Sequence, residues 1–180
     1  MQLGKLIDTR YEIQALLGEG GMASVYRAQD TRLGRTVAIK FIRRRAIPEE
    51  QAELVLKRFH KEAVALARLN HPNIITLHDY GEFEGSPYLV MEYAPHGSLA
   101  ERMGKHILYT EAAKIILPIV RALAYAHGEG VLHRDVKPAN ILFAVGEQPK
   151  LSDFGIAKLL EEDEANTNLT KTGVAIGTPK

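Results

Sequence analysis

Hydrophobic and polar residues alternate along much of the first half of the chain, which is the period-two pattern of half-buried β-strands. Such runs occupy residues 11–18, 24–30 and 35–43, and two more at 74–82 and 87–93 are separated by a Gly-Ser-Pro turn signal. The glycine-rich segment GEGGMA separates the first two runs. The pattern therefore predicts a series of consecutive strands with short connections.

Helical periodicity appears at two places. Residues 48–69 begin with a proline and two acidic residues, which suit the first turn of a helix. Steps of three and four residues then place one stripe of side chains on a single face: Val55, Phe59, Glu62, Leu66 and Leu69. A second helix is predicted from an N-cap at Thr110 to about residue 127. A strand-rich half, 1–94, is thus followed by a more helical half, 95–180.

Composition narrows the class of protein. The chain has 180 residues, 46% hydrophobic and 25% charged, which is typical of a globular domain. A net charge of +1 gives no electrostatic reason to bind nucleic acid or an anionic membrane. There is no cysteine, which excludes disulfides and thiolate metal sites, and no apolar run is long enough to span a bilayer. These features agree with a cytoplasmic location.

Lys40 and Glu62 are two charged residues at apolar positions. Alternation in RTVAIKFIR places Lys40 on one face with Ala38 and Ile42, and Glu62 lies in the middle of the apolar helical stripe. A buried charge is costly unless it is paired, so a Lys40–Glu62 ion pair would satisfy both groups. An exposed strand lysine, or an ion pair with a purely structural role, is the alternative.

The segment HRDVKPAN carries the strongest chemical signal in the sequence. Asp135, Lys137 and Asn140 bring a carboxylate, a cation and an amide into one loop, and Asp153 follows thirteen residues after Asn140 in SDFG. A carboxylate can accept a hydroxyl proton, a lysine can hold a phosphate, and carboxylate and amide oxygens can ligate a hard metal ion. This combination indicates phosphoryl-transfer chemistry.

These motifs occur in the order of the protein-kinase signature. GEGGMASV resembles the glycine loop, VAIK the third strand, HRDVKPAN the catalytic loop and DFG the metal-binding turn. The chain resembles the eukaryotic-like Ser/Thr protein kinases, and LGEGGMASVYRAQD is similar to their bacterial branch. The resemblance implies an α+β protein-kinase-like fold. Residues 1–94 would form an antiparallel N-lobe with a helix that binds ATP, and residues 95–180 a partial, mainly helical C-lobe.

The resemblance also implies a nucleotide site. The glycine loop (Gly18, Glu19, Gly20 and Gly21) would cover the phosphates of ATP, and Lys40, anchored by Glu62, would hold the α- and β-phosphates. The remaining contacts would surround adenine: Val25, Ala38 and Leu142 on its faces, Met91 at the back, and the backbone from Glu92 to Ala94 at its edge.

The catalytic roles implied by the resemblance fall on four residues. Asp135 would orient the substrate hydroxyl and accept its proton, and Lys137 would steady the γ-phosphate. Asn140 and Asp153 would hold Mg²⁺. His133 is expected to pack internally against Phe154.

The substrates would be Ser/Thr hydroxyls of proteins, because Lys137 after the aspartate follows the Ser/Thr pattern. Thr170 and Thr172 are expected as autophosphorylation sites that order the activation loop. A homodimer that supports autophosphorylation is also expected from the family.

Two departures from the family pattern bear on function. Ala23 replaces the third glycine of the loop, and no Tyr-x-x-Pro-Glu segment follows GTPK. Without the helices that normally come next, part of the apolar face of Ile115, Ile119 and Leu123 is expected to meet water, and the 180-residue chain is expected to show weak phosphotransfer or none. The alternatives are an ATP-binding regulatory module of pseudokinase type that transfers no phosphate, and a small-molecule phosphotransferase.

Overall fold

The computed structural model describes residues 2–43, 52–103 and 107–154. The predicted start of the first helix at Pro48 and the predicted phosphorylation sites Thr170 and Thr172 lie outside these ranges.

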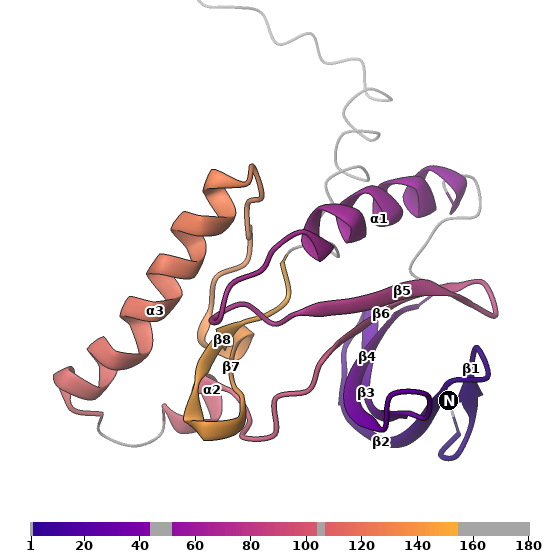
Figure 1. Ribbon diagram of the computed structural model, residues 1–180, viewed down its shortest axis with the longest axis horizontal. Helices are drawn as coiled ribbons and strands as arrows, with labels where there is room; N and C mark the ends of the chain where they lie inside the picture. The colour runs from indigo at the N-terminus through magenta and orange to yellow at the C-terminus, as the bar shows by residue number, and fades with distance from the viewer. Residues whose placement is uncertain (1, 44–51, 104–106, 155–180) are drawn as a thin grey trace, which may run out of the picture.

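A six-stranded antiparallel sheet forms the first part of the fold, in the order β1-β2-β3-β4-β6-β5, and it curls on itself (Figure 1). Its strands are β1 (Leu6–Ile7), β2 (Tyr11–Glu19), β3 (Ala23–Asp30), β4 (Arg35–Ile42), β5 (Leu77–Phe83) and β6 (Ser86–Glu92). In β3, buried residues alternate with more exposed ones, as the period-two pattern predicts. The short strand β1 was not predicted.

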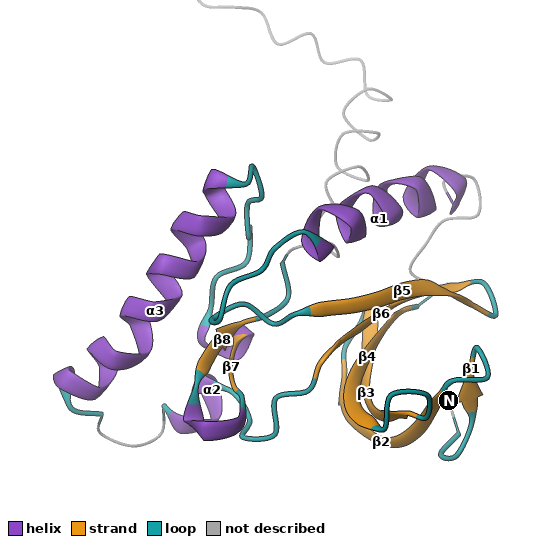
Figure 2. Ribbon diagram, viewed as in Figure 1, coloured by secondary structure: helices purple, strands orange, loops and turns teal. Residues whose placement is uncertain are grey.

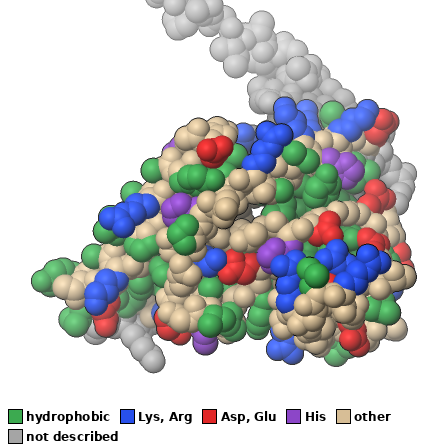
Figure 3. Space-filling model, viewed as in Figure 1, with side chains coloured by type: hydrophobic (Ala, Val, Ile, Leu, Met, Phe, Trp, Pro, Cys, Tyr) green, Lys and Arg blue, Asp and Glu red, His purple; other side chains and the backbone are tan. Residues whose placement is uncertain are grey.

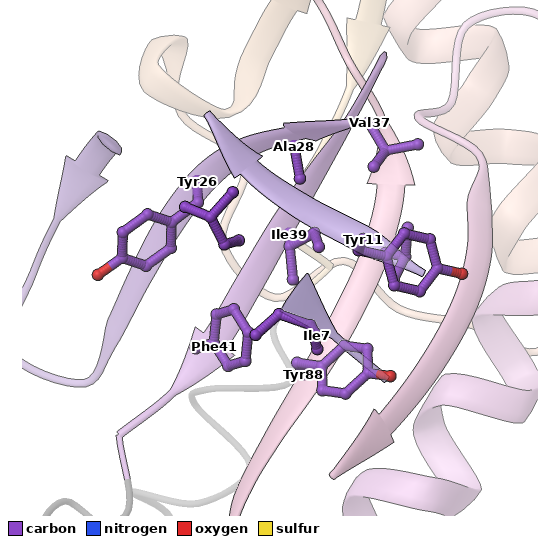
Figure 4. Packing of buried hydrophobic residues seen from close by; sticks show 10 residues of the cluster. Ile7, Tyr11, Tyr26, Ala28, Val37, Ile39, Phe41 and Tyr88 are labelled. Atoms are coloured by element: carbon purple, nitrogen blue, oxygen red, sulfur yellow. The ribbon is translucent and has the colours of Figure 1, made fainter. Parts of the chain in front are cut away.

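Side chains on the concave face of the curled sheet form its core. Tyr11, Phe41 and Tyr88 pack there with Ile7 and Ile39, all of them nearly inaccessible to solvent (Figure 4). The Phe41 and Tyr88 rings lie 5.5 Å apart between centroids. This packing places Ile7 of β1 in the core, which explains why so short a strand is held in the sheet.

Helix α1 (Ala52–Ala67) covers the other side of the sheet (Figures 1 and 2). Val55, Phe59 and Ala63 are buried against Ile42 of β4 and Leu89 of β6. Val55, Phe59 and Leu66 of the predicted stripe are therefore confirmed on the packing face of this helix, whereas Leu69 lies beyond its end and is buried in the core of the second part.

The second part of the described chain is built from short elements around one long helix. They are α2 (Leu99–Arg102), α3 (Tyr109–Gly128), η3 (Pro138–Asn140), β7 (Ile141–Phe143), η4 (Val145–Glu147) and β8 (Pro149–Leu151). The strands β7 and β8 form a separate antiparallel pair, in which Leu142 lies opposite Lys150. Ser98 and Glu101 form a capping box that starts α2 and that the sequence analysis did not identify.

Helix α3 corrects one prediction and agrees with another. Its N-cap is Leu108 rather than Thr110, and no side chain caps it. Part of the face formed by Ile115, Ile119 and Leu123 meets water, as expected, because Ile119 is buried in the core of the second part whereas Ile115 and Leu123 are only partly buried against it. The exposed apolar side chains of α3 are its neighbours Ile116, Leu117 and Val120. Hydrophobic side chains are visible at the α3 end of the molecule in Figure 3. The helix buries the face that meets β7 and β8, so the outward residues one position away stay exposed.

The segment between α1 and β5 attaches to the second part of the fold. The backbone N–H of Asn70 donates to the Tyr125 hydroxyl of α3 at 3.1 Å, and the His71 ring lies 5.3 Å from the Tyr125 ring. The Asn73 side chain donates to the carbonyl of Pro149 at 2.8 Å. Ile74 bridges to Leu151 of β8. These bonds explain why β5 begins at Leu77 rather than at the predicted residue 74.

Asp30 is a fully buried carboxylate at the end of β3. Arg10 donates to both of its oxygens, at 2.9 and 2.8 Å, and the backbone N–H groups of Arg32 and Leu33 donate at 3.2 and 3.3 Å. The Arg35 Nε lies 3.6 Å away. The hydrogen bonds from Arg10 outweigh burial and lower the pKa of Asp30 to about 2.

We expect acid to weaken the fold through Asp30. Its pKa is lower in the folded than in the unfolded chain, so its contribution to the free energy of unfolding is complete above the unfolded value, about 4, and is lost as pH falls towards 2. Urea unfolding at pH 5, 4 and 3 should show a steeper loss of stability in the wild type than in Asp30→Asn. Parallel pH profiles of the two proteins would contradict this assignment.

Candidate active site

A cleft of about 430 Å³ lies where the six-stranded sheet meets the second part of the fold. Most of the nucleotide-site residues expected from the sequence line it: Gly18, Val25, Ala38, Met91, Glu92, Ala94 and Leu142. Asp153 lines it as well. Lys40 lines a smaller adjoining cavity, together with Met91, Asp153 and Phe154.

The glycine segment forms the turn between β2 and β3. Gly18 pairs with Val25, and the Gly20 N–H donates to the carbonyl of Ala23 at 2.9 Å. The Glu19 side chain forms an ion pair with Arg43. Of the four predicted glycine-loop residues, Gly18 lines the cleft, whereas Glu19, Gly20 and Gly21 are not among its lining residues.

Lys40 pairs with a different carboxylate from the one predicted. Its Nζ lies 2.6 Å from Oδ1 of Asp153, and none of the ion pairs among the described residues includes Glu62. Glu62 is half-exposed, so water can solvate its carboxylate and burial does not force it to pair. The predicted Lys40–Glu62 ion pair is therefore replaced by Lys40–Asp153 in this structure.

Asp135, Lys137 and Asn140 form one polar cluster. The Lys137 Nζ lies 2.7 Å from Oδ2 of Asp135. The Asn140 Nδ2 donates to the same oxygen at 3.1 Å and to the Asp135 carbonyl at 2.8 Å. Because both amide contacts use the nitrogen, the amide oxygen of Asn140 stays available as a ligand. Arg134, directly before Asp135, has a φ of 63°, a strained conformation for a long side chain.

Ser152 and His133 hold this cluster beside Asp153. The N–H and hydroxyl of Ser152 both donate to the Asn140 carbonyl, at 2.8 and 3.1 Å. The His133 Nε2 donates to the Ser152 carbonyl at 2.7 Å, and its ring lies 4.6 Å from the Phe154 ring, so the predicted His133–Phe154 contact is confirmed. Burial lowers the pKa of His133, which keeps the ring neutral and favours a positioning role over proton transfer.

Several cleft residues were not identified from the sequence. They are Leu17, Ile75, Pro95, Gly97, Ser98, Glu101, Ala139 and Ser152. Leu17 directly precedes the first glycine of the loop, which is a usable signal. The remaining ones come from loops and short elements whose approach to the cleft depends on tertiary packing.

Comparisons with known proteins agree with this geometry. The sequence profile described as "Protein kinase domain" matches residues 11–178. A probable serine/threonine-protein kinase PknB of Lactococcus lactis is 42% identical over 180 residues, which are 98% of this chain and 28% of that protein. Serine/threonine-protein kinase PknA of Mycobacterium tuberculosis is 40% identical over 98% of this chain and 41% of its own length.

Solved structures show the same fold. The apo form of PpkA-294 superimposes with a TM-score of 0.81 at 27% identity, over 93% of this chain and 66% of that one. The kinase domain of M. tuberculosis PknI gives a TM-score of 0.73 at 33% identity, over 87% of this chain and 63% of that one.

The chain therefore belongs to the protein kinase family, and its curated relatives are serine/threonine protein kinases of bacteria. The predicted α+β kinase-like fold is confirmed. The chain spans between a quarter and a half of the length of these curated relatives. Within the described residues, no helix is long and apolar enough to cross a membrane.

Proposed function

We propose that this chain forms the ATP-binding and catalytic part of a protein kinase that transfers the γ-phosphate of ATP to Ser or Thr hydroxyls of proteins. One observation carries the proposal. The cleft that contains the predicted adenine contacts reaches Asp153, and hydrogen bonds through Ser152 link Asn140 to that same position. A nucleotide in the cleft would thus present its phosphates to the predicted catalytic residues.

Each residue receives a role from its position. Residues 1–94 would supply the strands that cover the nucleotide and the hinge, which is the backbone from Glu92 to Ala94, and residues 95–180 would supply the catalytic loop. Lys40, on β4, is a cation in the adjoining cavity, 2.6 Å from the cleft residue Asp153, and would bind phosphate oxygens. Asp135 would orient the incoming hydroxyl and accept its proton, and Lys137, 2.7 Å from it, would neutralise charge on the transferred phosphate.

The chemistry of the site fits Mg²⁺, which the protein kinase family generally uses with ATP. The Asp153 carboxylate and the amide oxygen of Asn140 are hard oxygen ligands of the kind this ion prefers. No group of three His, Cys, Asp or Glu that could hold a metal occurs among the described residues. Two protein oxygens suit Mg²⁺ that also binds phosphate oxygens and water, where it neutralises phosphate charge.

Substrates and regulation complete the proposal, and they rest on the family resemblance. The partners would be proteins with Ser or Thr hydroxyls, and two copies of the chain would pair for autophosphorylation at Thr170 and Thr172. A cytoplasmic location remains a prediction from the sequence. No observation in the structure favours the pseudokinase or the small-molecule alternative.

Binding of ATP to the 180-residue chain tests the proposal first. Mg²⁺-ATP should raise the unfolding temperature of the wild type, and Lys40→Met should weaken ATP binding about 10- to 100-fold, because a hydrogen-bonded charge pair with phosphate is lost. Thermal shift across an ATP concentration series gives both affinities. Lys57→Met removes an exposed lysine on α1 and serves as the matched control. Equal ATP affinity in wild type and Lys40→Met would overturn the assignment.

A further inference from the structure

Lys150 is a buried charge that the proposed chemistry does not use. It lies in the middle of β8 and is only 8% exposed. Its Nζ lies 2.8 Å from Oε2 of Glu92, at the end of β6. A buried ammonium requires a counter-charge, so this ion pair is part of the packed structure rather than a transient surface contact.

Glu92 is held by its main chain as well as by its side chain. The carboxylate oxygen that binds Lys150 also accepts from the N–H of Thr76, at 3.3 Å. The N–H of Glu92 donates to the carbonyl of Thr76 at 2.9 Å. Glu92 is thus fixed in position and in orientation at the point where β6 ends and the hinge begins.

Lys150 connects the end of β6, at Glu92, to β8 on the opposite wall of the cleft. In the β7–β8 pair it lies directly across from Leu142, and Asp153 follows three residues later. Leu142, Asp153 and Glu92 all line the cleft. The ion pair therefore sets the position of the hinge relative to the strand that forms the cleft floor.

The hinge backbone beyond Glu92 is free to meet a ligand. Tyr93 and Ala94 line the cleft, and their main-chain groups form no hydrogen bond with any other described residue. Both residues are half-buried at the cleft wall, and the edge of a purine base that enters the cleft can hydrogen-bond to their N–H and C=O groups. Adenine offers an amino donor where guanine offers a carbonyl acceptor, so the two bases need opposite backbone groups at that position.

We propose that the Lys150–Glu92 ion pair is a specificity-determining brace, which fixes the hinge backbone at residues 92–94 so that the cleft accepts adenine and rejects guanine nucleotides. The proposal rests on the proposed function in one respect, namely that a nucleotide occupies this cleft. If the hinge backbone cannot rotate, its N–H and C=O groups stay unpaired when guanine replaces adenine. Unpaired polar groups in a binding site lower the affinity for the wrong ligand strongly, so a rigid hinge discriminates between the two bases. Lys150 is not among the residues that line the cleft, so it would act through Glu92, as a positioning residue.

Removal of the brace should reduce selectivity more than overall binding. In Lys150→Met, the ratio of the GTP dissociation constant to the ATP dissociation constant should fall about 10-fold. This is the change expected when one hydrogen bond no longer distinguishes the two nucleotides. The double variant Lys150→Met/Glu92→Gln leaves no unpaired buried carboxylate and should lose selectivity to the same extent. Lys150→Arg keeps the charge and should retain most of the selectivity. Lys57→Met is the control for a lysine removed elsewhere.

The measurements are ATP and GTP titrations of the 180-residue chain followed by thermal shift, with amide hydrogen exchange of residues 89–95 in the same proteins. Faster exchange at the hinge, together with the lower ratio, supports the brace. A folded Lys150→Met or double variant with wild-type selectivity, or with unchanged hinge exchange, overturns it. If Lys150→Met does not fold, the double variant decides the question by the same two measurements. A wild type that binds neither nucleotide overturns the proposed function itself. Selective binding that persists in the variants is a different outcome, because it overturns only the brace.

Discussion

Replacement of Asp135 by asparagine is expected to lower the rate of phosphoryl transfer by about 10²- to 10⁴-fold, the usual contribution of a positioned general base. Asparagine has nearly the same shape and can still contact Asn140 and Lys137, but it cannot accept the hydroxyl proton. Asp135 is not among the residues that line the cleft, so ATP affinity should change by no more than about 2-fold.

This prediction is best measured where transfer is strong. The substitution is therefore made both in this chain and in a chimera in which residues 11–178 replace the matching segment of the L. lactis relative, a protein of which this chain covers 28%. The readout is the initial rate of labelled phosphate incorporation into a generic protein substrate. Val136→Ala, at the adjacent exposed position, is the control. A chimera with Asp135→Asn that keeps more than a tenth of its rate would refute the role given to Asp135.

The second large effect concerns stability, at Asp30. Asp30→Ala should lower the free energy of unfolding by about 3 kcal/mol, near the low end of the range for breaking a buried ion pair, because Arg10 loses its main partner but keeps Asp79 at 3.1 Å. Glu53→Ala is the matched control, since Glu53 is 85% exposed in its side chain, pairs with the exposed Lys57 at 2.7 Å, and its loss should cost no more than about 1 kcal/mol. Urea unfolding at pH 7 compares the three proteins. Equal losses in the free energy of unfolding in the two variants would show that the burial of Asp30 does not determine the cost of removing its carboxylate.

Local patterns predicted most of the fold. Alternation identified the long strands, and the apolar stripe identified the buried face of α1, because both depend on side chains within one element. The short elements escaped detection for a physical reason. β1 has two residues and is held by the insertion of Ile7 into a core supplied by other strands. Ile74 and Ile75 look like strand residues, but they bond to β8 instead of continuing β5.

The sequence predicted the parts of the candidate site that lie within one motif. It did not predict pairs of residues that are far apart in the sequence and meet only in the folded chain. Asp135, Lys137 and Asn140 lie within six residues of one another, and they form a cluster. The partner of Lys40 could not be read from the chain, because Glu62 and Asp153 both supply a carboxylate and only the packed structure decides between them. Lys150 was missed, although the signal that drew attention to Lys40, a lysine in a buried strand, applies to it equally.

The attachment of residues 70–73 has a mechanical consequence for α1. Just beyond the C-terminal end of this helix, Asn70 and His71 contact Tyr125, and Asn73 bonds to β8. The body of the helix packs against the six-stranded sheet through Val55 and Phe59. If the two parts of the fold rotate relative to each other, the C-terminal end of α1 stays attached to the second part while the body of the helix moves with the sheet. The helix therefore changes its angle about that end. The reach of Glu62 towards Lys40 is then governed by the angle between the two parts.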